Sequence, residues 1–378
     1  MGSTSSLGRV RSASVFLPLA AFAAALIGLS APAMAESGIA IGQAPPSFVE
    51  GVRHPEDLDR LTGTRWVIVS DFQPQDGALF AVDSDSPERA VVVPWAPGAA
   101  SGRISATEFS PHGIAAKRRS GGRYELLVVD HCGGKEAIDW LVLDASGQVP
   151  TVVEGKRIAA PQGTSGNAVA FVPGGGFVMT SMFDPDDRTT VDKVSAGKPT
   201  GGVWRWTSAQ GWKAFGPRLP GANGIAVTPD GAHLFVNAWS SRTILKLAMD
   251  GREEARASVD FLPDNLRWNG DDHLLIGGQA ATAHEIFTSG QPGAHFPKAY
   301  VVAELDTHTM TVRELVRKND DDAVREGFGA ATGALVVGRS VWVGSFMGDV
   351  LARFAIQTDP AKKKVEGDGV KAVRAQSP

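Results

Sequence analysis

The chain has 378 residues, of which 43% are hydrophobic and 21% are charged, and its formal net charge is −4. This apolar content is enough for a sizeable core and excludes a chain that is disordered throughout. A slightly acidic chain lacks the basic surface of a nucleic-acid-binding protein, so no nucleic-acid partner is expected. Cys132 is the single cysteine, which excludes an intramolecular disulfide and a thiolate metal cluster.

The first 35 residues have the pattern of a secretory signal peptide. Arg9 and Arg11 form a positive N-terminal region, residues 15–29 carry no charge, and Ala33-Met34-Ala35 fits the small-residue rule for cleavage. An uncleaved membrane anchor is the alternative, but two prolines interrupt the uncharged run and its apolar core is short for a membrane span. We therefore expect cleavage after Ala35 and a periplasmic or secreted protein whose mature chain has no transmembrane segment.

From residue 36 onward, short apolar runs are separated by glycine, proline, aspartate and asparagine, which is the pattern of β-strands joined by turns. No long amphipathic helical pattern interrupts them. The clearest runs are Trp66–Val69, Leu126–Val129, Trp140–Leu143, Phe177–Met179, Leu234–Val236, Leu274–Ile276 and Val341–Val343. Apolar residues become few after Pro360. We predict one β-domain over residues 36–360 and a flexible C-terminal tail over residues 361–378.

One unit of two apolar strands joined by a turn recurs six times along this domain. Further runs between the copies, such as Ala78–Val82 and Tyr300–Leu305, are candidates for outer strands. The copies begin at intervals of 56, 55, 56, 41 and 67 residues, at Glu56, His112, Asn167, Asn223, Asp264 and Ala331. A period of about 40–55 residues with several strands per unit is typical of a β-propeller. A pair of β-sandwiches would not explain the spacing, so we predict an all-β, six-bladed β-propeller.

The residues that open the six units are expected to form a ring, because the first strand of each propeller blade runs along the central channel. Two carboxylates, three carboxamides and one imidazole meet there, from Glu56, His112, Asn167, Asn223, Asp264 and Asn265. Such oxygen donors suit a hard cation, and six to eight of them suit calcium. Alternatively, these side chains hydrogen-bond to their own turns. Because two carboxylates in a narrow channel repel each other without a cation, we predict a central metal-binding channel.

The second strands of the units end at another set of residues, expected beside the ring at the mouth of the channel. These are Phe72, His131, Phe183, Trp239, Gln279 and Phe346. Mostly aromatic, they are candidates for the wall of a pocket for a partly apolar small molecule, with packing between blades as the alternative. His112 and His131 lie on the two strands of one hairpin, and a histidine pair beside a metal can take a proton from water near neutral pH.

Several segments occur in an order and spacing found in a known family. They are Pro111-His112-Gly113-Ile114, Leu127-Val128-Val129-Asp130-His131, Ala222-Asn223-Gly224-Ile225 with Pro229-Asp230-Gly231, and Asp264-Asn265. They resemble paraoxonase-type enzymes, which are relatives of the gluconolactonase and senescence-marker propellers. The likeness runs from about Glu56 to Phe354. The family has a six-bladed propeller with calcium in its channel and hydrolyses lactones and esters.

The resemblance implies a catalytic Ca²⁺ ion and a histidine dyad. Glu56, Asn167, Asn223, Asp264 and Asn265 would hold the ion. We further expect Asn167 and Asn223 to donate hydrogen bonds to the reacting oxygen. His112 and His131 would act together as the general base.

Two features depart from the family. Paraoxonases have an aspartate directly after the third-blade asparagine, where this chain has Ala168, although Asp57 and the backbone of Ile114 match the rest of that possible second metal site. We therefore expect one tightly held calcium ion. The family's disulfide also cannot form with one cysteine, so strand pairing must close the propeller.

The sequence thus predicts an exported, monomeric, calcium-dependent hydrolase of lactones or esters. One alternative is a gluconolactonase-type sugar lactonase, in which metal-bound water or a carboxylate replaces the histidine base. The other is a non-catalytic binding propeller with a structural metal, since a fold does not imply an activity.

Overall fold

The computed structural model describes residues 38–99, 108–291 and 293–357. The predicted signal peptide (1–35) and C-terminal tail (361–378) lie outside the described residues. Within the described part of the chain, no helix has the length and apolar character needed to cross a membrane.

The described residues form six four-stranded antiparallel sheets, which are the blades of a propeller. The first two contain β2 (Pro55–Arg60), β3 (Trp66–Asp71), β4 (Leu79–Asp83) and β5 (Val91–Val92), then β6 (Pro111–Arg118), β7 (Arg123–Asp130), β8 (Ala137–Asp144) and β9 (Thr151–Ala159). The next two contain β10 (Ser165–Phe171), β11 (Phe177–Phe183), β12 (Gly201–Thr207) and β13 (Gly211–Leu219), then β14 (Ala222–Val227), β15 (His233–Ala238), β16 (Thr243–Ala248) and β17 (Glu253–Ser258). The fifth contains β18 (Leu262–Asn269), β19 (His273–Gln279), β20 (Tyr300–Asp306) and β21 (Val312–Lys318), and the sixth β22 (Ala331–Val337), β23 (Ser340–Ser345) and β24 (Leu351–Ala355) with β1 (Ser47–Val49).

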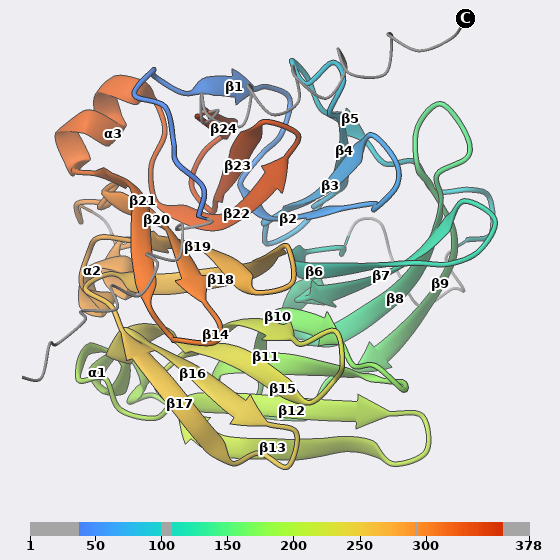
Figure 1. Ribbon diagram of the computed structural model, residues 1–378. Helices are drawn as coiled ribbons and strands as arrows, with labels where there is room; N and C mark the ends of the chain where they lie inside the picture. The colour runs from blue at the N-terminus through green and yellow to red at the C-terminus, as the bar shows by residue number, and fades with distance from the viewer. Residues whose placement is uncertain (1–37, 100–107, 292, 358–378) are drawn as a thin grey trace, which may run out of the picture. The chain divides into compact units, whose positions relative to one another are not determined.

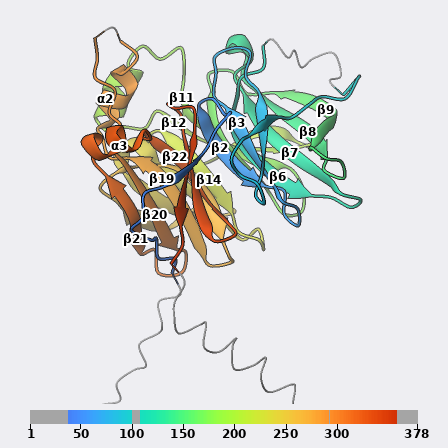
Figure 2. The same cartoon turned by 90° about the horizontal axis from the view of Figure 1, so that it is seen from above.

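The first strand of each blade lies innermost and the fourth lies at the periphery, as Figures 1 and 2 show for β2 and β9. The six repeat units found in the sequence are the first two strands of the six blades, which confirms the predicted propeller. The two runs named as candidate outer strands, Ala78–Val82 and Tyr300–Leu305, fall in the third strands β4 and β20.

The sixth blade closes the ring without a covalent link. β1, which precedes the first blade in the chain, pairs antiparallel with β24 near the C-terminus, with Ser47 opposite Arg353 and Val49 opposite Leu351. A bridge between Ile41 and Ile356 extends this pairing. Strand pairing therefore performs the closure, as expected for a chain with one cysteine.

The core consists of apolar layers between neighbouring blades. In one such layer, Ile68 and Leu79 of the first blade pack with Leu126 and Leu141 of the second. Their strands are hydrophobic on both faces, because each inner sheet is covered on both sides by its neighbours. Burying side chains of this kind contributes about 1.5–3 kcal/mol each before the cost of ordering them, and this holds the innermost strands in place.

Three short α-helices occur among the described residues, all in connections between strands. They are α1 (Thr190–Ser195), α2 (Ala283–Thr288) and α3 (Asp320–Glu326). α2 begins with a capping box between Thr282 and Glu285. α1 follows the end of β11 and α2 follows the end of β19, and these strand ends lie beside the start of the innermost strands. These two helices therefore flank the mouth of the channel at which the polar ring was predicted.

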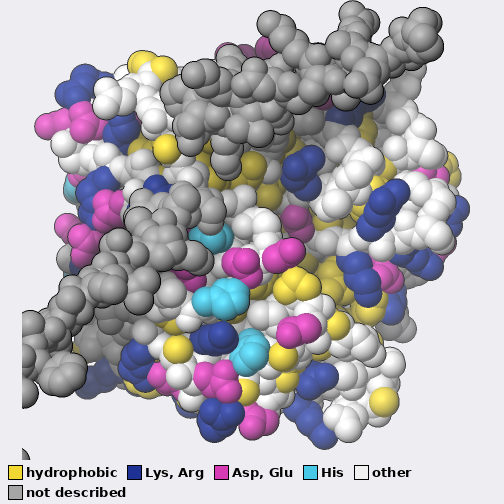
Figure 3. All heavy atoms as spheres, viewed as in Figure 1, with side chains coloured by type: hydrophobic (Ala, Val, Ile, Leu, Met, Phe, Trp, Pro, Cys, Tyr) yellow, Lys and Arg dark blue, Asp and Glu magenta, His cyan; other side chains and the backbone are white. Residues whose placement is uncertain are grey.

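Charges of both signs are interspersed on the face drawn in Figure 3. Pairs such as Arg256 with Glu253 and Arg317 with Glu314 lie within single outer strands. Exposed pairs of this kind contribute at most about 1 kcal/mol each. The buried charges of the channel differ from these exposed pairs, because burial and hydrogen bonding change their pKa values.

Candidate active site and metal centre

Each innermost strand carries a β-bulge that begins at the residue expected to open its repeat unit, except in the sixth blade, where the bulge begins at Thr332, one residue after the expected Ala331. Two residues of the inner strand lie opposite one residue of the second strand in every blade. A bulge disrupts the ladder locally and re-aims the side chains. The six pairs are Glu56–Asp57, His112–Gly113, Asn167–Ala168, Asn223–Gly224, Asp264–Asn265 and Thr332–Gly333. The six blades thus present equivalent positions around one channel.

Two glycines allow the bulged strands to approach one another closely. A Cβ atom at Gly113 would lie 2.2 Å from the carbonyl oxygen of Asn167, and one at Gly224 would lie 2.2 Å from that of Asp264. No side chain fits at either distance, so only glycine permits this spacing. The glycines in the His112-Gly113 and Asn223-Gly224 pairs therefore bring the ring residues of neighbouring blades together.

All five predicted metal ligands lie in the ring and are buried, with between 1% and 6% of their surface exposed. Each has a side-chain oxygen without a hydrogen-bond partner among the described residues, namely Glu56 Oε2 and the Oδ1 atoms of Asn167, Asn223, Asp264 and Asn265. A buried oxygen without a partner costs about 1–3 kcal/mol. Five of them on the inner strands of one channel indicate that a group outside the chain completes the site.

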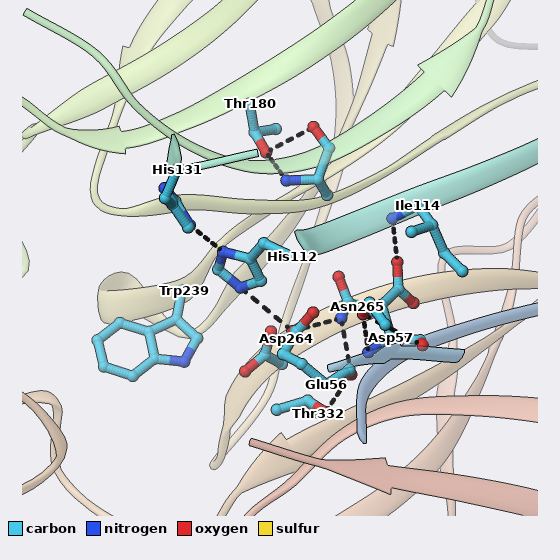
Figure 4. A network of polar contacts seen from close by, with 12 residues as sticks. Glu56, Asp57, His112, Ile114, His131, Thr180, Trp239, Asp264, Asn265 and Thr332 are labelled. Atoms are coloured by element: carbon cyan, nitrogen blue, oxygen red, sulfur yellow. Dashed lines mark hydrogen bonds and ion pairs between the residues drawn. The ribbon is translucent and has the colours of Figure 1, made fainter. Parts of the chain in front are cut away.

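Hydrogen bonds inside the ring leave these oxygens free. Asn265 donates through Nδ2 to Glu56 Oε1 at 2.8 Å, so its own Oδ1 is left without a partner. Gln279 donates to Asp264 Oδ2 at 2.8 Å, which leaves Oδ1 of that carboxylate free. Figure 4 shows Glu56, Asp264 and Asn265 directed toward one another in the channel. Asn265 thus uses its donor within the ring, and Glu56, Asp264 and Asn265 each keep a free acceptor.

The ring carries two carboxylates that are costly to ionise together. Burial raises the pKa of Glu56 and that of Asp264, and repulsion from Glu56 raises the pKa of Asp264 further. A divalent cation would reverse both effects, because it favours the charged forms. Two carboxylate and three carboxamide donors are hard oxygen ligands of the kind that Ca²⁺ binds. No group of three or more His, Cys, Asp or Glu residues suited to a metal occurs in the described chain, in keeping with a site rich in amides.

The residues of the possible second metal site do not fit a metal, because an arginine from the fifth blade engages both of them. Arg267 donates through Nη2 to Asp57 Oδ2 and, at 2.7 Å, to the carbonyl oxygen of Ile114. The backbone N–H of Ile114 donates to the same Asp57 oxygen at 2.8 Å. The structure thus brings Asp57 and Ile114 together as predicted, but around a guanidinium group. Arg267 was not singled out from the sequence.

The two predicted histidines lie in contact at the edge of the ring (Figure 4). Nδ1 of His112 is 2.9 Å from Nε2 of His131, and Nε2 of His112 is 3.5 Å from Glu56 Oε1. The Phe72 ring covers His112, with 4.3 Å between ring centroids. Burial, and the neighbouring His131, lower the pKa of His112 to about 3, so its imidazole is neutral near pH 7.

A third residue, Glu136, extends the histidine pair. Its Oε1 lies 2.7 Å from Nδ1 of His131, and its Oε2 accepts a hydrogen bond from the backbone N–H of Gly166 at 2.8 Å. The short 3-10 turn η1 (Cys132–Gly134) reverses the chain, with positive φ at Cys132 and Gly133, and returns Glu136 to His131. Glu136 was not predicted from the sequence. The only sequence signal of the chain reversal that brings it to His131 is the pair Gly133-Gly134.

A pocket of about 620 Å³ opens over the histidines and the third blade. Its lining includes the polar side chains of His112, His131, Glu136 and Asn167 and the apolar side chains of Phe72, Pro74, Met182 and Phe183. Phe72 and Phe183 therefore line the pocket as predicted. Its size and its mixture of an apolar wall with a few polar groups are typical of a small-molecule site.

The other predicted wall residues lie elsewhere. Trp239 and Gln279 are each 1% exposed, because Trp239 donates through Nε1 to Gln279 Oε1 at 2.9 Å while Gln279 holds Asp264. These two residues hold the side chain of Asp264 in place and do not line the pocket. Phe346 packs on Phe296, with 5.5 Å between centroids, and does not line this pocket. The strand-end pattern located these side chains, but it did not show which of them face the pocket.

The fold is shared with solved propeller structures. A luciferin-regenerating enzyme has a TM-score of 0.53 at 12% sequence identity, over 83% of this chain and 97% of that chain. A gluconolactonase from Xanthomonas campestris has a TM-score of 0.52 at 16% identity, over 84% of this chain and 97% of that chain. A protein of unknown function from Bacteroides thetaiotaomicron has a TM-score of 0.51 at 13% identity, over 83% and 76%. No protein-family model and no curated protein matches the chain. At these identities the likeness establishes the fold, which is that of the gluconolactonase-like propellers.

Proposed function

We propose that this chain is an exported, calcium-dependent hydrolase of lactones or esters. One observation carries the proposal: five buried oxygens without partners occupy the ring directly beside a Glu136–His131–His112 chain of hydrogen bonds. The first feature suits a hard cation and the second suits removal of a proton from water. Both adjoin one partly apolar pocket.

Glu56, Asn167, Asn223, Asp264 and Asn265 would hold the ion. A calcium ion held there would supply electrostatic stabilisation for a carbonyl oxygen that gains negative charge during attack. These residues are positioned by the bulges and by internal hydrogen bonds, so the site is built before the ion binds and little reorganisation is needed.

His112 is suited to act as the general base. Its Nε2 faces the ring, while its Nδ1 is engaged by His131. As the water oxygen attacks the carbonyl carbon, one water proton passes to Nε2 of His112. Cleavage of the ester C–O bond then releases an alcohol, which remains attached to the acid when the substrate is a lactone, and the departing oxygen takes up a proton. A positioned base of this kind contributes about 10²–10⁴-fold.

The pocket favours a substrate with an apolar part. Phe72, Met182 and Phe183 form a hydrophobic wall next to His112 and Asn167. Phe183 is held in turn by Phe287 of α2, with 5.7 Å between centroids. Such a wall stabilises alkyl or aryl groups and leaves the hydroxyls of a sugar without partners. We therefore favour an aliphatic lactone or an aryl ester over a sugar lactone.

A sugar lactonase is the second candidate, because the fold is shared with a gluconolactonase. In that case a carboxylate of the ring, such as Asp264, would serve as the base in place of His112. The pocket wall and the histidine contact favour the first candidate.

A panel of substrates tests the proposal. We expect chelator-treated protein to hydrolyse alkyl-substituted γ- and δ-lactones or aryl acetates only after calcium is added back, and to act less well on gluconolactone. A higher kcat/KM for gluconolactone would favour the second candidate. If calcium binds but no lactone or ester is hydrolysed, the non-catalytic binding propeller is the better account.

A further inference from the structure

Glu136 accepts two hydrogen bonds that need two acceptor atoms. Oε1 faces Nδ1 of His131 and Oε2 faces the backbone N–H of Gly166, at 2.7 and 2.8 Å. The side chain is 17% exposed, so water competes only weakly for these oxygens. Because the Gly166 N–H can only donate, a carboxylate accepts from both partners, whereas an amide whose oxygen accepts from Gly166 would turn a donor toward His131 and impose the other tautomer.

These contacts determine where the protons of both imidazoles lie. A carboxylate accepts, so His131 carries its proton on Nδ1, and in the neutral ring its Nε2 is an acceptor. Nδ1 of His112 must then donate to that Nε2, 2.9 Å away. The lone pair of His112 is left on Nε2, the atom that faces the ring.

We propose that Glu136 is a positioning residue that fixes the tautomers of both histidines and directs the basic nitrogen of His112 toward the ring. The inference rests on the proposed function, because it assigns a base to that reaction. When Nε2 of His112 takes a proton from water, the Nδ1 proton of His112 passes to Nε2 of His131. The positive charge then lies on His131 beside the Glu136 carboxylate, one residue further from the ring.

The test compares Glu136→Gln with Glu136→Asp. In Glu136→Gln the amide oxygen can serve Gly166 or His131 but not both, so we expect kcat on a responsive lactone to fall at least tenfold, toward the full loss of a base of about 10²–10⁴-fold. KM and calcium affinity should change little, because the pocket wall and the ring are untouched. Glu136→Asp retains two acceptors and should restore part of the rate.

Tautomers provide a readout that does not depend on activity. Long-range ¹H–¹⁵N correlation spectra of the wild type should show His131 protonated on Nδ1 and His112 unprotonated on Nε2, and Glu136→Gln should disturb this pattern. The matched control is Glu254→Gln, which alters a carboxylate 3.0 Å from His233 Nε2 in the fourth blade and should leave kcat unchanged. Wild-type tautomers in Glu136→Gln, or an unchanged kcat, would overturn the inference. If the wild type hydrolyses nothing, the spectra still decide the tautomers, and the proposed function alone fails.

A second inference comes from Arg267, which is 8% exposed and reaches three inner strands. Besides Asp57 and Ile114, it donates through Nε to the carbonyl oxygen of Leu58 at 2.8 Å and through Nη1 to that of Leu266 at 3.0 Å. Its partners on β2 lie more than 200 positions away in the chain. A single cation thus joins the first, second and fifth blades next to the ring.

We infer that Arg267 is an internal cation that takes the place of a second metal ion in the channel. It neutralises Asp57 and bonds to the Ile114 carbonyl, which are the acceptors that a metal at this position would use. A guanidinium group and a metal ion cannot share these acceptors. The fold should therefore need no second ion, and the chain should bind one calcium.

Metal stoichiometry tests this inference in the wild type. Elemental analysis after dialysis against micromolar calcium should give one calcium per chain, and two would overturn it. Arg267→Met should lower Tm in chelator, and its gain in Tm on adding calcium should be no larger than that of the wild type, since Asp57 alone is a poor metal site. The control Arg313→Met removes a half-exposed arginine bonded to Glu304 in an outer strand and should lower Tm less. The double variant Arg267→Ser with Ala168→Asp should bind a second calcium ion, and this binding should raise its Tm. If Arg267→Met has the same Tm as the wild type, Arg267 does not act as a structural cation in the channel.

Discussion

Replacing His112 with Gln is expected to lower turnover of a lactone by about 10²–10⁴-fold, the contribution of a positioned general base. Glutamine can keep the packing under Phe72 and a hydrogen bond to His131, so the fold should be preserved. Its neutral amide has no basic nitrogen, and the water proton has no acceptor at that position. Steady-state kinetics at saturating calcium measures the effect.

Calcium affinity separates this loss from a structural one. His112 is not among the five residues with free oxygens, so the dissociation constant for calcium should stay within a few-fold of that of the wild type. The control is His233→Gln, because His233 also contacts a glutamate but lies at the start of β15, the end of that strand remote from Asn223. If His112→Gln retains near-full activity, a carboxylate of the ring is the base, and the sugar-lactonase reading gains support.

Replacing a ring carboxylate should have the second large effect. Glu56→Gln and Asp264→Asn each remove one of the two negative charges while keeping an oxygen in place. We expect calcium affinity to fall by more than the roughly 10–100-fold typical for loss of an outer partner of a metal ligand. The gain in Tm on adding calcium should shrink in parallel, because the ion stabilises only the folded chain. Calorimetric titration measures the calcium affinity, and thermal unfolding measures the gain in Tm. If both variants bind calcium with wild-type affinity, the ion does not bind at the ring.

The same carboxylates determine how calcium binding depends on pH. Burial raises the pKa of Glu56 and Asp264, so each holds a proton at a higher pH than an exposed carboxyl group. Calcium needs the deprotonated forms, so protons compete with it and apparent affinity rises with pH, by up to about tenfold per unit for each proton released. Activity at limiting calcium should therefore fall as the pH is lowered. At saturating calcium it should fall less, because the low pKa of His112 keeps that ring neutral.

The propeller and the ring could be predicted from the sequence for the same physical reason. Each blade must repeat the pair of inner strands to enclose a channel, so one residue pair returns at near-constant spacing. The polar residues at this point, such as Asn167 and Asn223, stand out against the apolar strand that follows them. Equivalent positions in a closed ring face the same axis, so the symmetry of the propeller predicts that these polar side chains lie close together.

Glu136 and Arg267 depend on contacts that have no such periodicity. Glu136 meets His131 because a three-residue turn with positive φ reverses the chain, and the sequence shows only a pair of glycines there. Arg267 lies two residues past Asn265, but the sequence does not show that its long side chain reaches Asp57 and Ile114 on two other blades. Trp239 and Gln279 turn inward because they bond to each other, a pairing between two blades that hydrophobic patterns do not reveal.

Stepwise reconstitution with calcium tests the central claim most directly. Chelator-treated, dialysed protein is titrated with calcium while hydrolysis of a responsive lactone and bound calcium are measured on the same sample. We predict that activity rises in proportion to bound ion and saturates at one calcium per chain in the wild type, and that Asp264→Asn shows neither tight binding nor activity at that stoichiometry. Full hydrolysis by the calcium-free protein, or activity that appears without binding at the ring, would contradict it.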